Sequence, residues 1–217
     1  MPRVIVLHAR DVGGRWYGVA CADERLVATA VSSARARTLG HLRRSLPTGV
    51  PHREAGEDRS DFVERTIALL VELEAGREEH KAFSLATEYV GEALAGVLSV
   101  AAAIPLGYVT SYGHIAKAAH VEARDVGKIM ASNPLYPIVP CHRVVGADLS
   151  LVGYSGSKAP AALRAKLARL SREARGFGAE QDVLVQGRAL RVYPVEWAIA
   201  NAEKDAAPAG RQRTLFE

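Results

Sequence analysis

A cysteine followed directly by a histidine and an arginine is the strongest chemical feature of this sequence. Cys141 lies in the run Pro140-Cys141-His142-Arg143-Val144. The thiolate form of cysteine is the working nucleophile, whereas a free thiol is mostly protonated at neutral pH. The adjacent His142 and Arg143 can lower the pKa of the thiol. Because neighbouring side chains rarely point at each other, we expect a water molecule to bridge His142 and Cys141.

This short run leaves other interpretations open. A buried structural cysteine beside a surface His-Arg pair fits the same residues. A cysteine hydrolase also fits, since it requires at least a cysteine and a histidine. No oxyanion-binding arrangement is legible around Cys141, however, and a hydrolase would turn over many times.

The second cysteine, Cys21, lies in the apolar, strand-like segment Tyr17 to Ala22. We expect it to be a buried small hydrophobic residue. The two cysteines lack the partners and the spacing of a zinc site. The sequence therefore predicts no metal ion and no other cofactor.

The composition is that of a soluble globular protein with a mild positive charge. Of the 217 residues, 48% are hydrophobic and 24% are charged, and the formal net charge is +4. This length suits one large domain or two small ones. Residues 143–191 contain more bases than acids, so the C-terminal half is expected to face phosphate. No apolar run approaches the roughly 18 residues of a membrane helix, and no signal peptide is visible, so we expect a cytoplasmic protein that does not bind membranes.

The first part of the chain has the pattern of a small sheet followed by helices. Strands are expected at residues 4–7, 16–22 and 26–31, with turns at Gly13-Gly14 and Asp23-Glu24. A helix over residues 34–45 and a polar loop over 47–59 should follow. Ser60 or Asp61 can cap a second helix, which carries Val63, Ile67, Leu70, Val71 and Glu74 on one face. The charged residues 76–81 are expected to link this part to the next.

The second part contains the spacing of a helix-turn-helix. A short strand at residues 82–85 should precede a helix that Thr87 caps and that ends near residue 103. Two short helices are then expected, from Thr110 or Ser111 to residue 119 and over residues 123–132. Helix pairs of this kind also occur in proteins that do not bind DNA. The prolines predict an extended segment at 136–140. A helix over 161–175, with bases on its outer face, should follow. A hairpin formed by 183–185 and 189–193 and a disordered tail from Asp205 on are expected after it.

Five segments of this second part share residues, order and spacing with one protein family. They are Ile104-Pro105-Leu106-Gly107-Tyr108-Val109-Thr110-Ser111-Tyr112, Arg124-Asp125-Val126-Gly127, Met130-Ala131-Ser132-Asn133-Pro134, Ile138-Val139-Pro140-Cys141-His142-Arg143-Val144-Val145-Gly146 and Gly153-Tyr154-Ser155-Gly156. Over roughly residues 83–195 this set resembles the O6-alkylguanine-DNA alkyltransferase family.

The resemblance implies an α/β (α+β) fold with two domains. Residues 1–81 would form a ribonuclease-H-like domain, residues 82–200 a mostly helical winged-helix domain with the active site, and residues 201–217 a flexible tail. The implied activity is DNA repair by a methylated-DNA–protein-cysteine methyltransferase. The alkyl group of O6-alkylguanine would pass once and irreversibly to the Cys141 thiolate. Because the lesion is stacked in the duplex, its nucleotide must first be flipped out, at a cost of a few kcal/mol.

The resemblance assigns the DNA contacts to the second helix of the pair. In the family this helix enters the minor groove, where small residues allow close approach; here these are Gly127, Ala131 and Ser132. Arg124 falls at the position of the arginine that replaces the flipped base in the stack. Lys128 stands where a second glycine is common, and we expect its ammonium group on a phosphate.

Further roles implied by the resemblance concern the base pocket. Tyr112 matches the tyrosine that protonates the leaving guanine and helps to rotate the phosphate. Asn133 matches the residue that ties the turn after the recognition helix to the cysteine loop. Tyr136 stands where a shorter residue or a proline is frequent, which would alter the pocket width. The other expected pocket residues are Pro140, Val144 through its carbonyl, Tyr154, and Ser155, which can hydrogen-bond to O6.

In this family a glutamate orients the histidine that deprotonates the cysteine, here His142. An ungapped count from Tyr154 places Ala168 at the glutamate position. The family has a lysine seven residues before that glutamate, and Lys166 and Glu173 have this spacing. We therefore infer a longer connection around residues 157–162 and predict that Glu173 orients His142.

The expected partner is double-stranded DNA that contains O6-alkylguanine, bound by a monomer associated with the nucleoid. One alternative is a non-catalytic winged-helix protein that binds alkyl lesions, although relatives of that type lack the cysteine. Another is a winged-helix DNA binder with an accidental cysteine. At the C-terminus, Gln212, Leu215 and Phe216 resemble a sliding-clamp-binding peptide, and a tail without function is the alternative there.

Overall fold

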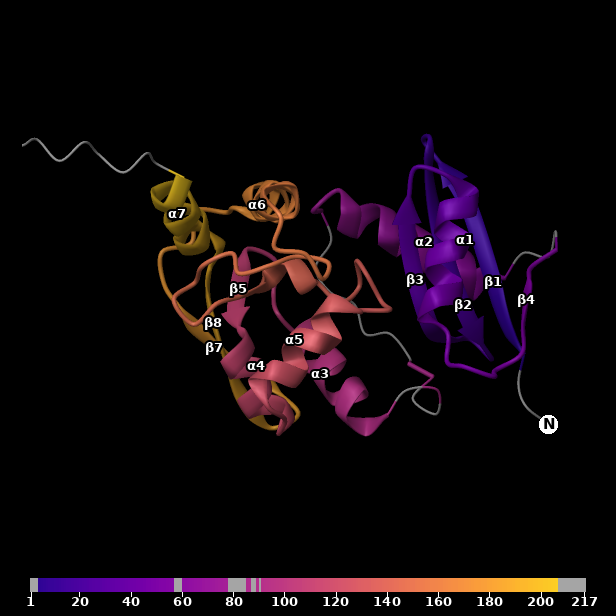
Figure 1. Ribbon diagram of the computed structural model, residues 1–217, viewed down its shortest axis with the longest axis horizontal. Coiled ribbons are helices and arrows are strands. Elements are labelled where there is room, and N and C mark those ends of the chain that lie inside the picture. Colours follow the sequence, from indigo (N-terminus) through magenta and orange to yellow (C-terminus); the bar gives the residue numbers. More distant parts are fainter. Residues whose placement is uncertain (1–3, 57–59, 78–84, 87–88, 90, 207–217) are drawn as a thin grey trace, which may run out of the picture.

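The computed structural model describes residues 4–56, 60–77, 85–86, 89 and 91–206. Two four-stranded sheets lie in separate parts of the molecule, each with its own helices (Figure 1). The predicted α/β fold is therefore confirmed. Within the described residues, no helix has the length and apolar character needed to cross a membrane.

The N-terminal sheet begins with an antiparallel meander. Its strands are β1 (Ile5–Val12), β2 (Arg15–Ala22) and β3 (Arg25–Ser32), which confirms the three predicted strands. Both turns use backbone conformations with positive φ, at Gly13-Gly14 and at Asp23-Glu24. Tight hairpin turns require this conformation, so the predicted turn positions are also confirmed.

A fourth strand lies in the segment predicted as a loop. β4 (His52–Glu54) pairs in parallel with β1, so the sheet order is β3-β2-β1-β4. All three residues are exposed, so no apolar alternation marks this strand in the sequence. It is held by backbone bonds to β1 and by Glu54, whose carboxylate pairs with Arg35 and Arg43.

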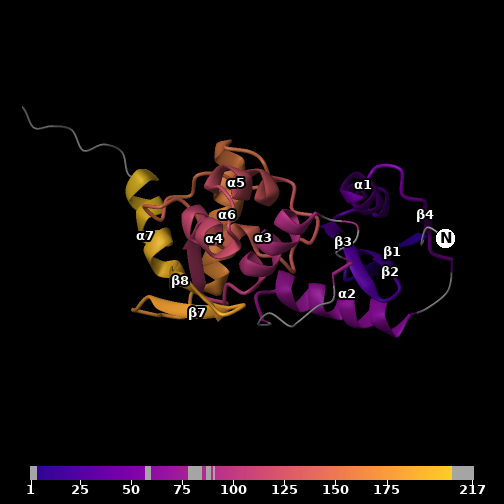
Figure 2. The same cartoon turned by 90° about the horizontal axis from the view of Figure 1, so that it is seen from below.

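Two helices cover opposite faces of this sheet (Figure 2). α1 (Arg35–Ser45) packs Leu39 and Leu42 on one face. α2 (Asp61–Glu74) packs its apolar side, which includes Ile67, on the other face, against β2. Both predicted helices are confirmed. Ser60 occupies the N-cap position of α2, but its side chain makes no capping bond.

The connection between the two parts is only partly described. Of the predicted strand 82–85, only Leu85 is described, and it forms a parallel bridge with Leu26. Thr87, the predicted cap, lies outside the described residues. α3 (Glu92–Ala102) begins at the N-cap Gly91, later than predicted. Ala86 donates its backbone N–H to the Leu26 carbonyl at 2.9 Å, so Ala86 lies along β3 and not in a helix.

The C-terminal part contains the predicted helix-turn-helix. Its helices are α4 (Tyr112–Ala119) and α5 (Ala123–Ala131). The Ser111 side chain caps α4 by accepting from the His114 backbone N–H at 3.1 Å. His120 ends α4 in the left-handed conformation, with φ 54°.

The second sheet frames this helix pair. It has the order β6-β5-β8-β7, with strands β5 (Tyr108–Ser111), β6 (Val144–Val145), β7 (Gln181–Val185) and β8 (Arg188–Pro194). β7 and β8 are the predicted hairpin, whereas β5 was not predicted. One core cluster joins both parts, because α2 residues and residues of α3, α4 and α5 belong to it.

Two helices complete the chain. α6 (Pro160–Glu173) confirms the predicted helix over 161–175. α7 (Val195–Ala206) was not predicted, and it makes residues 201–206 helical, so the first part of the predicted flexible tail is wrong. Ile199, on its apolar side, belongs to a cluster with Leu170 and Val145, which explains why the helix continues. Residues 207–217, including the clamp-like peptide, lie outside the described residues.

Candidate active site

Cys141 lies in a short, buried turn between Pro140 and β6. The turn is the 3-10 helix η2 (Cys141–Arg143), in which Arg143 donates its backbone N–H to the Pro140 carbonyl at 2.8 Å. β6 then pairs in parallel with β5, which leads directly into α4. The fold therefore holds the cysteine beside the start of the helix-turn-helix. The Cys141 residue is only 7% exposed.

Asn133 joins the end of α5 to the cysteine loop. Its Nδ2 donates to the Val139 carbonyl at 2.8 Å, and its Oδ1 accepts from the Leu135 backbone N–H at 2.9 Å. Val139 donates its own N–H back to the Leu135 carbonyl at 2.8 Å. Residues 135–139 thus form a turn, and the predicted extended segment is wrong. The prolines exclude a helix but not a tight turn, which the Asn133 side chain stabilises.

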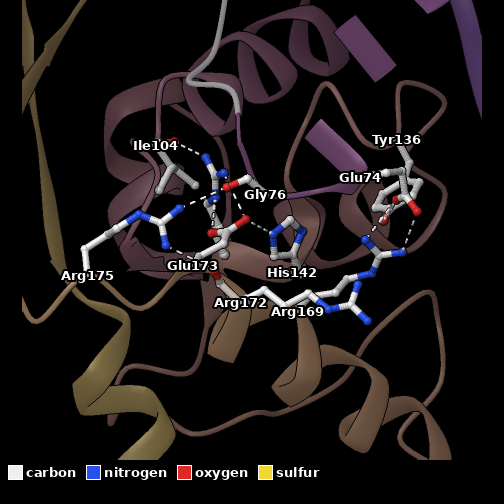
Figure 3. A network of polar contacts seen from close by, with 10 residues as sticks. Glu74, Gly76, Ile104, Tyr136, His142, Arg169, Arg172, Glu173 and Arg175 are labelled. Carbon is white, nitrogen blue, oxygen red and sulfur yellow. Dashed lines mark hydrogen bonds and ion pairs between the residues drawn. The ribbon is translucent and has the colours of Figure 1, made fainter. Parts of the chain in front are cut away.

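Glu173 lies between His142 and Arg143 in the protein interior. His142 Nε2 is 2.8 Å from Glu173 Oε1, and Arg143 Nε donates to Oε2 at 2.7 Å. Arg143 also donates to the Ile104 carbonyl at 2.7 Å. Figure 3 shows the carboxylate directed at the imidazole. The structure therefore places Glu173, the residue inferred from the lysine–glutamate spacing, in contact with His142.

The protonation state of this pair follows from its surroundings. Burial opposes ionisation of Glu173, but its contacts with His142 and Arg143 outweigh this effect and lower the pKa of Glu173 to about 2. An ionised carboxylate can only accept, so Nε2 of His142 carries the proton. Burial lowers the pKa of His142, which keeps the ring neutral at pH 7. Its Nδ1 is buried and has no hydrogen-bond partner among the described residues, so a free lone pair is available there.

The resting form of Cys141 is the thiol. Burial raises the pKa of Cys141, and a hydrogen bond with Asn133 and the charges of Lys166 and Arg169 offset only part of this effect. A base is therefore needed to form the thiolate. His142 Nδ1 is the neutral basic atom next to it in the chain.

Lys166 is a fully buried cation that supports the cysteine loop. Its Nζ donates to the Val144 carbonyl at 2.6 Å and to the Gly153 carbonyl at 2.9 Å. Burial lowers the pKa of Lys166 to about 8. The prediction that α6 bases lie on its outer face is thus wrong for Lys166. Its seven-residue spacing to Glu173 places both on one helical face, a signal that could have predicted its burial.

Val144 is completely buried and is not among the residues that line the cavity of about 340 Å³ beside Cys141. Its carbonyl, which the family resemblance directed toward the base, already accepts from Lys166. Pro140 is likewise absent from the lining of this cavity and of a second, larger cavity that also borders Cys141.

A second, partly buried ion pair joins the two parts of the molecule next to this site. Glu74, at the end of α2, accepts from the Tyr136 hydroxyl at 2.5 Å and from Arg169 Nη1 at 2.9 Å. The Arg169 guanidinium also lies 4.8 Å from the centre of the Tyr136 ring. Figure 3 shows these side chains converging on Glu74. Sequence analysis missed this cluster, because Glu74 follows the apolar face of α2 and its partners are 62 and 95 residues away.

A cavity of about 340 Å³ opens beside Cys141. Of the predicted residues, Tyr112, Gly127, Ala131, Tyr154 and Ser155 line it, whereas Asn133 and Tyr136 line a second cavity. Burial raises the pKa of Tyr112, so its phenol is protonated and can donate. The lining residues that sequence analysis missed are Ala123, Met130, Val152, Gly153, Gly156, Ser157 and Lys158.

The outer face of α5 forms one rim of this cavity. Arg124, Lys128, Ala131 and Ser132 are exposed, whereas Val126 and Met130 are buried. Lys128 donates to Asp125 at 2.8 Å, so a phosphate would have to compete with this carboxylate for its ammonium group. Arg124 is left as the cation of this face without a partner among the described residues.

Comparisons with known proteins find a matching family over part of the chain. The family described as 6-O-methylguanine DNA methyltransferase, DNA binding domain, matches residues 93–175. This range contains α4, α5, the cysteine loop and Glu173. Over residues 93–175 the chain is therefore similar to the DNA-binding domain of the 6-O-methylguanine DNA methyltransferase family.

Curated relatives named methylated-DNA–protein-cysteine methyltransferase match part of the chain. A methylated-DNA–protein-cysteine methyltransferase of Pyrobaculum aerophilum is 55% identical over 53 residues, which cover 24% of this chain and 36% of that protein. The inducible methylated-DNA–protein-cysteine methyltransferase of Bacillus subtilis is 38% identical over 81 residues, or 36% of this chain and 45% of that protein. The alignments thus span about a third to a half of the relatives' lengths.

A solved structure of the methyltransferase family extends the likeness beyond the matched domain. A variant of the Mycobacterium tuberculosis O6-methylguanine methyltransferase has a TM-score of 0.51 and 25% sequence identity. The comparison covers 81% of this chain and 96% of that one. The two-part architecture is therefore shared.

Proposed function

We propose that the protein is a methylated-DNA–protein-cysteine methyltransferase that repairs DNA by accepting alkyl groups from O6-alkylguanine on Cys141. This proposal rests on one observation: the buried Cys141 lies at the wall of a cavity, and the adjacent His142 contacts the ionised Glu173 through Nε2. The names of the curated relatives support the same activity.

The proposed reaction starts with removal of the thiol proton. A water molecule would carry it from Cys141 to Nδ1 of His142, and Glu173 would stabilise the imidazolium. The thiolate then forms a bond to the alkyl carbon as the bond from that carbon to O6 breaks. The electron pair stays on guanine, which takes a proton from the Tyr112 phenol. The His142 imidazolium then returns its proton through water to the Tyr112 phenolate, so that overall the thiol loses one proton, guanine gains one, and atoms and charge balance.

The product should be a stable thioether, so each molecule acts once. The cavity of about 340 Å³ is large enough for a purine base. It lies beside α5, the helix that we propose faces DNA, and not within the base stack of a duplex. The target nucleotide would therefore leave the base stack to reach Cys141. Arg124 would fill the space that it leaves.

Mass spectrometry tests the proposed stoichiometry. Protein mixed with an equal amount of duplex that contains one O6-methylguanine should gain one methyl group in place of one hydrogen. The gain should map to the peptide with Cys141. An unchanged mass would contradict the proposal, and restored guanine in large excess over protein would instead indicate a multiple-turnover enzyme.

Arg124→Ala is expected to slow alkyl transfer from duplex DNA on the order of 10- to 100-fold, because an unfilled stack makes base flipping less favourable. Transfer from the free base O6-benzylguanine needs no flipping and should keep its wild-type rate. Single-turnover rates with both substrates measure this difference. Arg164→Ala removes the same charge from an exposed position of α6 and serves as the control. Equal slowing with the free base would exclude the role in flipping.

A further inference from the structure

Cys141 borders a second cavity, on the side of the N-terminal sheet. This cavity has a volume of about 550 Å³ and is lined by β3, the last turn of α1, the end of α5 and Tyr136. It shares five residues with the cavity described above: Met130, Ala131, Cys141, Tyr154 and Ser155. Cys141 thus lies on the wall of both cavities, and we call the second cavity the α1 subsite.

The inner wall of the α1 subsite is held in place by polar contacts. Thr29 of β3 donates its backbone N–H to the Pro134 carbonyl at 2.7 Å and its hydroxyl to the Tyr136 carbonyl at 2.9 Å. Glu74 and Arg169 hold the Tyr136 side chain. These contacts fix the distance between the N-terminal sheet and the cysteine loop, so the subsite is preformed.

The outer wall of the α1 subsite is cationic. His41 and Arg44 of α1 line it, and none of its described lining residues is acidic. The neighbouring Arg43 pairs with Glu54, whereas Arg44 has no carboxylate partner in the described part of the chain. Burial, together with Arg44 and Arg37, lowers the pKa of His41, so Arg44 supplies the charge at neutral pH.

The reaction requires space beside the alkyl carbon. If the guanine occupies the first cavity, this carbon lies between O6 and the sulfur of Cys141 during transfer. Because the sulfur attacks from the side opposite O6, any further atoms of a larger alkyl group must extend sideways from this carbon. The α1 subsite begins at the same cysteine and is the larger of the two cavities.

We propose that the α1 subsite holds the outer end of large O6-alkyl groups and that Arg44 selects groups that end in a carboxylate. This inference rests on the proposed function. The chemical step is unchanged: the sulfur–carbon bond forms, the carbon–O6 bond breaks, and guanine keeps the electron pair and gains a proton.

Two free bases of nearly equal shape test the proposal. O6-(4-carboxybenzyl)guanine carries a negative charge at the end of its arm, and O6-(4-carbamoylbenzyl)guanine is neutral. Because neither probe contains phosphate, contacts of α1 with a DNA backbone do not enter the measurement. The quantity compared is the ratio of the two second-order rate constants for alkylation of Cys141, measured at pH 8 by mass spectrometry.

In the wild-type protein the carboxylate probe should react faster than the amide probe. Arg44→Gln should lower the ratio about fivefold, the size expected for one partly exposed ion pair. Arg43→Gln makes the same charge change one residue away, where the guanidinium pairs with Glu54, and should keep the wild-type ratio. High salt should lower the wild-type ratio and leave that of Arg44→Gln constant.

The possible results separate the two proposals. A wild-type ratio of 1 or less, or an unchanged ratio in Arg44→Gln, overturns the α1 subsite while leaving the transfer reaction intact. Failure of the wild-type protein to accept a methyl group from duplex DNA that contains O6-methylguanine overturns the proposed function, and the subsite with it. Methyl transfer without any transfer of a benzyl group from O6-benzylguanine overturns the subsite alone. The O6-benzylguanine rate of each variant also reports whether its active site is folded.

Discussion

Cys141→Ser is expected to reduce alkyl transfer at least a thousandfold, to the limit of detection. A serine hydroxyl fills nearly the same space but is a far weaker nucleophile at neutral pH, because its proton is held much more tightly than that of a thiol. The measurement is single-turnover transfer from duplex that contains O6-methylguanine. Affinity for the same duplex should stay near that of the wild type, since no DNA-facing residue changes.

The second cysteine provides a matched control for this experiment. Cys21 is buried in β2, and burial raises the pKa of its thiol to about 11. Cys21→Ala should therefore accept alkyl groups at the wild-type rate. Methylation of the Cys141→Ser variant at Cys21, or at any other residue, would show that Cys141 is not the acceptor.

Glu173→Gln should have the second largest effect, on both rate and stability. The amide keeps the shape but cannot balance the charge that His142 gains as it takes the thiol proton. We expect transfer to slow by about two orders of magnitude. The Arg143 guanidinium also loses its carboxylate in a site where both side chains are nearly inaccessible, which should lower the free energy of unfolding by about 3–5 kcal/mol.

An exposed glutamate gives the corresponding control. Glu180 pairs with Arg191 at 3.1 Å, and both side chains are about 40% exposed. Glu180→Gln should change the free energy of unfolding by less than about 1 kcal/mol. Denaturant titration of both variants measures the difference, and equal losses would mean that Glu173 does not form the buried pair.

The pH dependence of stability is a separate consequence of this pair. The pKa of Glu173 falls from an ordinary value of 4.5 in the unfolded chain to about 2 in the folded protein. Its contribution, on the order of 3 kcal/mol, is therefore complete above about pH 4.5 and is lost as the pH falls toward 2. Denaturant titrations between pH 3 and 7 should show a shallower decline for Glu173→Gln than for the wild type. Parallel curves would contradict the low pKa of Glu173.

Local patterns were enough to predict much of the fold and the reactive residues. Alternating apolar residues and turn-forming pairs predicted β1 to β3, and helical periodicity with a serine cap predicted α4 and α5. The lysine–glutamate spacing of the family that the sequence resembles predicted the contact of Glu173 with His142. These features depend on residues that are close in the sequence.

Other features depend on segments that meet only in the folded chain. β4 has no apolar pattern and forms because its backbone pairs with β1 at the edge of the sheet. Glu74 became part of the site through partners on the cysteine loop and α6. Lys166 can be buried because two backbone carbonyls accept hydrogen bonds from its ammonium group. The α1 subsite likewise exists only where α1, β3 and the end of α5 surround Cys141. The sequence by itself thus determined the nucleophile, its histidine and most of the elements that carry them. Only the tertiary structure decided which distant charges and cavities surround them, because such contacts leave no periodic signal in the chain.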